Sequence, residues 1–236
     1  MQNKQAITLL FLANIISGLA QGISMVAIPW YFVKVVSRPE VFASAYIIIT
    51  FLTLFWGLYA GTLIDKFRRK NIFLAETSIG AIWLLSVAAF GFYFGHVPIF
   101  LAALVFATTF FTYNIHYPAL YAFVQEITDK EHYSRITSYL EIQGQLTNVM
   151  AGGLGAILLA GIQGGSQNIL GWQFHFPFSI EAWSLHEVFL LDGCTYMLSF
   201  LLIFPIHYQA VAIRKQEKSN LVERFKIGIQ FLKQNP

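Results

Sequence analysis

Residues 41–70 read VFASAYIIITFLTLFWGLYAGTLIDKFRRK, an uncharged run that ends in a cluster of acidic and basic side chains. No Asp, Glu, Lys or Arg occurs between positions 41 and 64. A helix that crosses the hydrocarbon core of a bilayer, about 30 Å thick, needs about 20 consecutive apolar residues. Such a helix also satisfies its backbone hydrogen bonds internally, as lipid requires. The stretch therefore predicts a transmembrane helix followed by a short charged turn.

Similar apolar runs occupy most of the remaining sequence. The chain of 236 residues is 56% hydrophobic and 11% charged, whereas about a quarter of the residues of a soluble domain are charged. The excess apolar surface is expected to face lipid. We predict an all-α membrane protein in which residues 1–210 form a bundle of six transmembrane helices, at about 7–33, 41–64, 71–95, 97–124, 136–162 and 187–206.

The basic residues predict how this bundle sits in the membrane, because Lys and Arg are retained on the cytoplasmic side during insertion. With the N-terminus inside, the segments after the second, fourth and sixth spans are cytoplasmic. Of the 15 Lys and Arg residues, only Lys34 and Arg38 then lie outside. We expect both termini in the cytoplasm.

Two segments outside the spans carry further patterns. Every second residue from Trp172 to Phe178 in the outer loop 163–186 is aromatic. This alternation is typical of an extended chain along an apolar boundary and favours an interfacial belt, with a functional lid as the alternative. Residues 211–236 are expected to form a cytoplasmic linker, and the apolar face of 219–236 predicts an amphipathic helix on the membrane surface.

The charged turn has a specific spacing, Gly61-x-x-x-Asp65-x-x-x-Arg69-Lys70. Gly61 would let a neighbouring helix approach closely, and Asp65 could accept hydrogen bonds from a facing helix N-terminus. Arg69 and Lys70 would anchor the turn to the inner leaflet. The retention of basic residues in cytoplasmic loops explains Arg69 and Lys70, but not the glycine and the aspartate at these positions.

This spacing, between the second and third spans, resembles the signature loop of the major facilitator superfamily. The resemblance extends along the chain through YPALYAFVQEIT (117–128), EVFLLDGCTYML (187–198) and LVERFKIGIQFLKQNP (221–236). These stretches are similar to the branch that exports drugs and siderophores, the group with macrolide and enterobactin exporters. Two features depart from that branch: the stretch 148–161 lacks the proline of the antiporter motif, and Gln21 stands where many exporters have an acid.

The resemblance implies a twelve-span secondary transporter of the bacterial inner (plasma) membrane that works by alternating access, with this chain as its N-terminal half. The implied activity is proton- or ion-coupled efflux of a small amphipathic molecule. We expect the chain to be a fragment that is not transport-competent alone. Its expected partners are the small-molecule substrate, the lipid bilayer and the missing C-terminal six-span half.

Polar side chains inside the spans are candidates for the translocation path, because they are costly to place in lipid. Helical spacing gathers them into stripes on the first, fourth and fifth spans. The resemblance places these three spans around the central cavity. Helix packing is the alternative role for the small residues among them. The candidates for substrate or coupling contacts are Asn14, Gln21, His116, Glu141, Gln145 and Asn148.

Three acids and one histidine are the ionisable groups inside the predicted spans that need a partner. Glu141 is the leading candidate for coupling, with a structural ion pair to a nearby basic residue as the alternative. His116 is either a proton-coupling group or a hydrogen-bonded interior histidine. Asp192 is expected to be a structural acceptor for Thr195, Tyr196 or a neighbouring helix. Glu76 is a second structural candidate, possible partner of the charged turn.

Other classes of function find no support in the residues. There is no set of nucleophile, base and orienting group, no phosphate loop and no cluster with metal-ligand spacing, so we expect neither an enzyme nor a cofactor or metal site. The basic residues lie between apolar runs and not on one face, which excludes a nucleic-acid partner. The alternative function is a six-span membrane scaffold or a channel subunit that acts as a homodimer.

Overall fold

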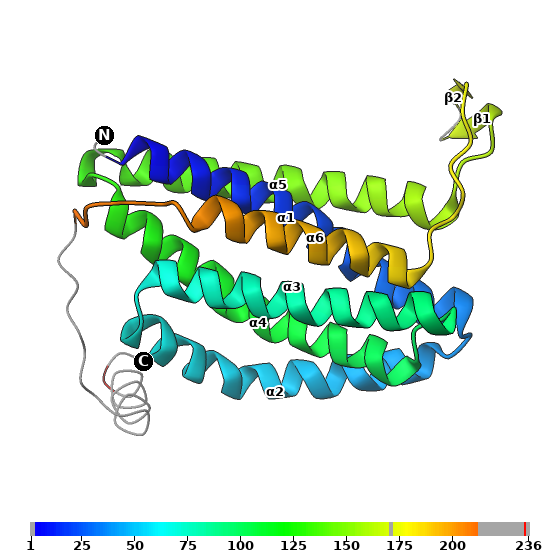
Figure 1. Ribbon diagram of the computed structural model, residues 1–236, viewed down its shortest axis with the longest axis horizontal. Helices are drawn as coiled ribbons and strands as arrows, with labels where there is room; N and C mark the ends of the chain where they lie inside the picture. Colours follow the sequence, from blue (N-terminus) through cyan, green and yellow to red (C-terminus); the bar gives the residue numbers. More distant parts are fainter. Residues whose placement is uncertain (1–2, 170–171, 212–233, 235–236) are drawn as a thin grey trace.

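The computed structural model describes residues 3–169, 172–211 and 234, and it is mostly helical. Long helices run side by side along the molecule (Figure 1). Each lies within a few residues of a predicted span. Their bounds are α1 Lys4–Trp30, α2 Pro39–Lys66, α3 Arg69–Phe94, α4 Ile99–Ile127, α5 Lys130–Ala160 and α6 Leu185–Ile203.

Five helices in the described part of the chain are long and apolar enough to cross a membrane. They are α1 with the turn that follows it, the Pro39–Gly57 part of α2, and α3, α4 and α6. The remaining helix, α5, is long enough at 31 residues but carries more polar side chains. The sixth span therefore stays a prediction.

Local sequence explains several helix ends. Gly95 ends α3 in the left-handed conformation, which glycine adopts at little cost. Ser184 and Glu187 form a capping box at the start of α6. Pro29 lies inside α1, and a π-helical turn, Tyr31–Val35, follows it. Because proline lacks the N–H of a regular helix, an irregular turn near this position is expected.

The helix α1 is central to the bundle. It contacts α4, α5 and α6, while α3 packs on α6 and α4, and α2 packs mainly on α4. The approach of α1 to α5 is close, because a Cβ added to Gly22 would lie 2.5 Å from the Cβ of Ala151. Small residues at helix crossings are what allows such packing in a membrane.

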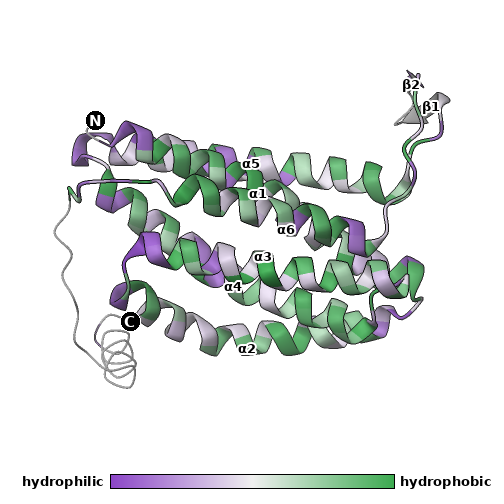
Figure 2. Cartoon of the chain, viewed as in Figure 1, coloured by the Kyte–Doolittle hydropathy of each residue, from purple (hydrophilic) through white to green (hydrophobic). Residues whose placement is uncertain are grey.

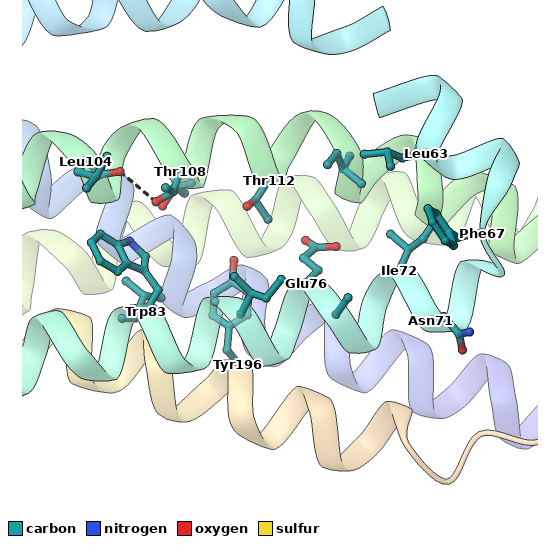
Figure 3. Close-up of a pocket in the computed structure, with 16 residues that line it drawn as sticks. Leu63, Phe67, Asn71, Ile72, Glu76, Trp83, Leu104, Thr108, Thr112 and Tyr196 are labelled. Carbon is teal, nitrogen blue, oxygen red and sulfur yellow. Dashed lines mark hydrogen bonds between the residues drawn. The ribbon is translucent and has the colours of Figure 1, made fainter. Parts of the chain in front are cut away.

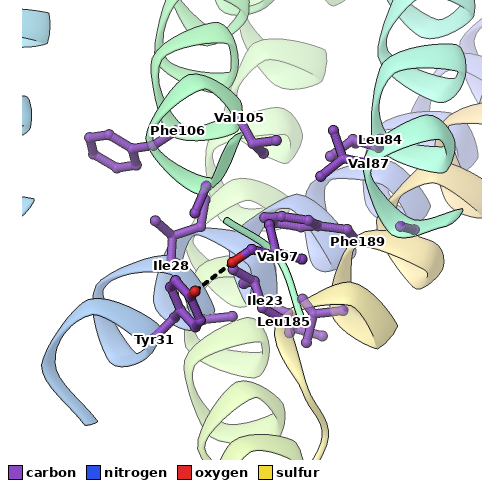
Figure 4. Packing of buried hydrophobic residues seen from close by; sticks show 14 of the residues in the cluster. Ile23, Ile28, Tyr31, Leu84, Val87, Val97, Val105, Phe106, Leu185 and Phe189 are labelled. Carbon is purple, nitrogen blue, oxygen red and sulfur yellow. Dashed lines mark hydrogen bonds between the residues drawn. The ribbon is translucent and has the colours of Figure 1, made fainter. Parts of the chain in front are cut away.

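The core consists of two apolar clusters, one towards each end of the bundle. One includes Ile28, Phe106 and Phe189 (Figure 4), and the other includes Leu10 and Phe123. Polar side chains occupy the positions between these clusters on α1, α3, α4 and α5. We call this set the polar middle layer, and it comprises Asn14, Gln21, Glu76, His116, Gln143 and Asn148.

The loop between α5 and α6 forms a β-hairpin, which the all-α prediction did not include. Strands β1 Gly165–Ile169 and β2 Trp172–Phe176 pair antiparallel, and a bridge joins Ile162 to Ile180. The hairpin extends beyond the ends of α5 and α6 (Figure 1). The extended backbone predicted here is confirmed, but it pairs with itself. Its role as an interfacial belt stays a prediction.

The chain starts at the end of the bundle opposite the hairpin, and the α2–α3 and α4–α5 turns lie at that same end (Figure 1). Figure 2 shows hydrophilic residues concentrated there, at the start of α1, α3 and α5. The segment after α6 also runs along this end. The predicted linker at 211–236, with its amphipathic helix, lies outside the described residues apart from Val211 and Gln234.

Candidate functional site

A cavity of about 590 Å³ opens at the level of the polar middle layer, between α1, α2, α4 and α5. Amide, hydroxyl and phenol groups line it together with small residues. Because polar groups inside a membrane bundle usually mark a substrate or ion pathway, we take this cavity as the candidate site. Its lining residues are Asn14, Gly18, Gln21, Gly22, Met25, Val26, Thr53, Thr109, Phe110, Tyr113, Asn114, Tyr117, Gln143, Gly144, Thr147, Asn148, Ala151 and Gly152.

The structure brings three of the six candidates from the sequence into this lining and leaves Glu141, Gln145 and His116 outside it. Asn14 and Gln21 on α1 and Asn148 on α5 line the cavity. Gln145 and Glu141 are exposed and are not among its lining residues. The cavity therefore meets one edge of the predicted α5 stripe, at Asn148 and Gly152, and the adjoining face through Gln143 and Thr147.

Glu141 has a partner on a neighbouring helix. The hydroxyl of Tyr121 on α4 donates a hydrogen bond to its carboxylate. Arg135, a basic residue two turns earlier on α5, instead donates to the hydroxyl of Tyr139 and lies against that ring. The structural ion pair considered for Glu141 is thus replaced by a hydrogen bond to a tyrosine.

A larger cavity, of about 740 Å³, lies between α2, α3, α4 and α6 (Figure 3). Its wall is mostly apolar. Two buried polar atoms in this wall, Oε2 of Glu76 and Nε1 of Trp83, have no hydrogen-bond partner within the described chain. We prefer the smaller cavity as the substrate site because more of its polar groups converge on it.

A chain of hydrogen bonds through the polar middle layer connects the two cavities. Nδ1 of His116 lies 2.8 Å from Oε1 of Glu76, and Nε2 of His116 lies 2.8 Å from Oδ1 of Asn14. The amide nitrogen of Asn14 donates to Oε1 of Gln143 over 3.1 Å. Glu76 lines the larger cavity, and Asn14 and Gln143 line the smaller one. His116 is thus hydrogen-bonded inside the bundle, which leaves a role in proton coupling open, and Glu76 pairs with it and not with the charged turn.

A second set of polar contacts joins α1 to α6. Gln21 donates to the hydroxyl of Tyr196 over 3.0 Å, and Ser24 donates to Oδ2 of Asp192 over 2.6 Å. Asp192 is 1% exposed, and its other oxygen has no partner among the described residues. The side chain of Thr195 bonds the backbone carbonyl of Asp192 and not its carboxylate. Asp192 is therefore an acceptor for a neighbouring helix, one of the alternatives the sequence left open.

The basic residues of the charged turn contact the ends of other helices, and their anchoring to the inner leaflet stays a prediction. The guanidinium of Arg69 lies 3.3 Å from Glu126 near the end of α4. The ammonium of Lys70 donates to the backbone carbonyls of Phe204 and Ile206, at 2.8 Å each. These carbonyls at the end of α6 have no partner inside the helix, so Lys70 satisfies them and complements the negative end of the helix dipole.

The other two signature positions behave differently from each other. A Cβ added to Gly61 would meet no atom within 4 Å in the described residues, so the close helix approach expected there is not made inside this bundle. Asp65 is half-buried at the end of α2.

Glu126, the partner of Arg69, also accepts a hydrogen bond from the hydroxyl of Tyr208. Burial and this carboxylate raise the pKa of Tyr208 to about 12.

Sequence reasoning missed six polar residues that line the smaller cavity, among them Thr53 on α2 and Thr147 on α5. Gln143 comes from α5, and Tyr113, Asn114 and Tyr117 come from α4. A signal for Gln143 was present, because it precedes Thr147 and Ala151 at the four-residue spacing of one helical face. No spacing pattern singles out the tyrosines, and only their place in the bundle assigns them to the cavity.

Comparison with known proteins agrees with this arrangement of helices and polar groups. No curated protein matches the chain. The family model described as Major Facilitator Superfamily matches residues 10–236. Members of this family are transporters and not enzymes. The family match therefore does not favour the alternative function, a membrane scaffold or a channel subunit. With a bundle of apolar helices around a polar cavity, and with a match over nearly its whole length, the chain belongs to the major facilitator superfamily of membrane transporters.

Proposed function

We propose that this transporter exports a small amphipathic molecule across the plasma membrane by secondary active transport, coupled to a proton or another ion. The observation that carries the proposal is the cavity of about 590 Å³ in the polar middle layer, lined by four helices. Efflux and the bacterial inner membrane rest on the sequence resemblance to drug and siderophore exporters. Alternating access requires that substrate or ion bind one orientation of the protein better than the other.

The chemistry of the cavity wall supports an amphipathic substrate. Asn14, Gln21 and Asn148 offer amide donors and acceptors, while Met25 and Phe110 offer apolar surface. A ligand site of this size that is mainly apolar with a few polar groups fits a drug-sized molecule. We assign substrate contacts to these three amides.

We further propose that α5 is the sixth span. Its 31 residues, at about 1.5 Å each, give a length of about 46 Å, enough to cross a bilayer. It packs along α1, and its polar residues Gln143 and Asn148 line the cavity. Polar side chains that face a cavity do not contact lipid. In this topology the charged end of the bundle, which holds Arg69, Lys70 and Lys130, lies in the cytoplasm.

A second helical bundle is the partner that this site requires. Tyr113 is 50% exposed although it lines the cavity, and Asn148 beside it is also exposed. The cavity is therefore open on the side formed by α4 and α5. A bundle placed against that side would enclose the substrate and provide the second surface for alternating access.

Ligand-induced stabilisation of the purified protein tests the substrate site. A panel of amphipathic compounds is screened by thermal unfolding in detergent, because a ligand that binds only the folded state raises Tm. We expect the shift caused by a hit to disappear in Asn148→Ala and in Gln21→Ala. Gln145→Ala is the matched control, since Gln145 is on the same helix as Asn148 but outside the cavity. Equal shifts in all three variants would refute the assignment.

Transport is then measured with the hits in proteoliposomes that contain the chain together with its second six-span half, under an imposed pH gradient. We expect uptake into vesicles that are acidic inside, and collapse of this uptake when a protonophore is added. Glu141→Gln tests the leading coupling candidate from the sequence. If substrate accumulated to the same level with and without each imposed ion gradient, secondary active transport would be contradicted.

A further inference from the structure

Both ring nitrogens of His116 contact oxygen atoms. Nδ1 lies 2.8 Å from a carboxylate oxygen of Glu76, and Nε2 lies 2.8 Å from the amide oxygen of Asn14. An ionised carboxylate and an amide oxygen can only accept hydrogen bonds. With Glu76 ionised and the amide oxygen of Asn14 facing the ring, both nitrogens donate, and only the protonated imidazolium carries two N–H groups. The arrangement is that of a histidine with its proton bound.

The orientation of the Asn14 amide follows from its other partner. Its nitrogen donates to Oε1 of Gln143 over 3.1 Å, so its oxygen is left to face His116. When His116 loses the proton from Nε2, that nitrogen becomes an acceptor and needs a donor. Asn14 then has to rotate its amide to offer its nitrogen to His116. Its oxygen now faces Gln143, which must rotate in turn to donate.

We propose that His116 is the proton-binding site of transport, and that its protonation state sets the direction of the hydrogen bonds from Asn14 and Gln143 into the substrate cavity. This inference rests on the proposed function of that cavity. Glu76 is the charge partner that holds the proton-bound imidazole. Asn14 is a positioning residue that transmits the state of the ring to Gln143.

The reversal changes what the cavity offers to a substrate. With the proton bound, Gln143 directs its oxygen to Asn14 and has its NH₂ group left for the cavity. After proton release, its oxygen is the group left for the cavity. A substrate that donates a hydrogen bond at this position is then bound better when His116 is neutral. Proton and substrate thus oppose each other's binding, which is the linkage that exchange requires.

Glu76 is the acidic side chain in contact with His116. On α3, the neighbouring helix, Phe73 packs edge-on to the imidazole ring. From its own helix, the phenol of Tyr117 lies against the ring. The α5 acid Glu141 is bonded to a tyrosine, and α1 contributes the uncharged Asn14. The charged residues of α2 (Glu40, Asp65 and Lys66) lie at its two ends, and Tyr196 of α6 lines the larger cavity beside Glu76.

NMR of the full chain in lipid nanodiscs, labelled with ¹⁵N-histidine, tests the proton site directly. The His116 signals are assigned by their loss in His116→Gln. We expect wild-type protein to pass from the imidazolium to the neutral form as the pH is raised. At a fixed pH in this range, Glu76→Gln should lower the ratio of imidazolium to neutral His116 roughly tenfold or more, because it removes an adjacent negative charge. A His116 that is neutral at every pH would overturn the proposal.

The role of Asn14 is tested with a side chain that can only accept hydrogen bonds, an ionised aspartate. Asn14→Asp cannot donate to Nε2 when ionised, so the imidazolium-to-neutral ratio should rise roughly tenfold or more at the same pH. The matched control is Asn114→Asp, because Asn114 also lines the cavity but bonds only the backbone of its own helix, at Phe110. Equal rises in the two variants would mean a general charge effect and would overturn the role of Asn14.

Transmission to the cavity is tested at Gln143, which in the described part of the chain is connected to His116 through Asn14. Gln143→Glu offers only an acceptor to Asn14 and should also raise the imidazolium ratio. The same change in an Asn14→Leu background should have a much smaller effect, because the connecting amide is gone. An equal effect in both backgrounds would refute the switch. These signals need no substrate, so their failure is distinguishable from loss of ligand stabilisation in Asn148→Ala.

Discussion

The helices α1 and α5 cross so closely at Gly22 that the structure predicts the effect of a substitution there. In Gly22→Ala the new methyl group would lie 2.5 Å from the Cβ of Ala151. Carbon atoms in contact are normally about 3.5–4.0 Å apart. The two helices would have to separate locally by roughly 1–1.5 Å to accommodate it. We expect this overpacking to lower the free energy of unfolding by about 1–3 kcal/mol.

Gly18→Ala is the matched control one turn earlier on the same helix. There the added Cβ would lie 3.5 Å from a methyl group of Thr147, an ordinary contact. Both substitutions bring a similar gain in helix propensity, about 1 kcal/mol, so the difference between the variants isolates the packing at Gly22. The assay is reversible unfolding by SDS in mixed micelles, followed by circular dichroism. If Gly22→Ala proved as stable as Gly18→Ala, the close approach of α1 and α5 would be wrong.

Three further predictions concern other contacts. Lys70→Met should lower Tm, because two carbonyls at the end of α6 lose their donor, whereas Lys70→Arg should restore part of the loss. Ser24→Ala removes the donor to buried Asp192 and should cost about 0.5–2 kcal/mol in the same SDS unfolding assay. Ser17→Ala, whose hydroxyl bonds only its own helix, should cost less. Because the pKa of Tyr208 is raised to about 12, its contribution to stability is complete below pH 10 and is lost as the pH rises towards 12. A Tyr208→Phe variant should not show this loss in alkaline unfolding titrations, and an identical loss in both proteins would contradict it.

The sequence predicted the helices to within a few residues, because long uncharged runs and charged turns fix the position of an apolar helix. The helix α5 is the exception that shows the limit. The second half of α5, around Leu158, is apolar enough to indicate a transmembrane helix. Its first half contains charged and amide side chains and few apolar ones. The β-hairpin escaped prediction for a different reason. Alternation indicated an extended chain, but the pairing of Gly165 with Phe176 is not visible in the pattern of either strand.

The candidate site was predicted in part, for reasons of geometry. On α5 two polar stripes share the helical period, and only the packing of Ala151 against α1 decides which one meets the cavity. The sequence chose the stripe with Glu141 and Asn148, of which Asn148 lines the cavity, whereas Gln143 of the adjoining face lines it in place of Glu141. The pairing of Glu76 with His116 needs the neighbourhood of α3 and α4, which spacing along one helix cannot supply.

The contacts between α1 and α6 have a consequence for biogenesis. Ser24 and Gln21 leave the ribosome early, but their partners Asp192 and Tyr196 follow 168 and 175 residues later. At about 5–20 residues per second, that interval is roughly 10–30 s of translation. During this time the polar groups of the first helix lack these partners, and unpaired polar groups are costly in lipid, until α6 arrives. Assembly of the bundle is thus completed only when synthesis of α6 is complete.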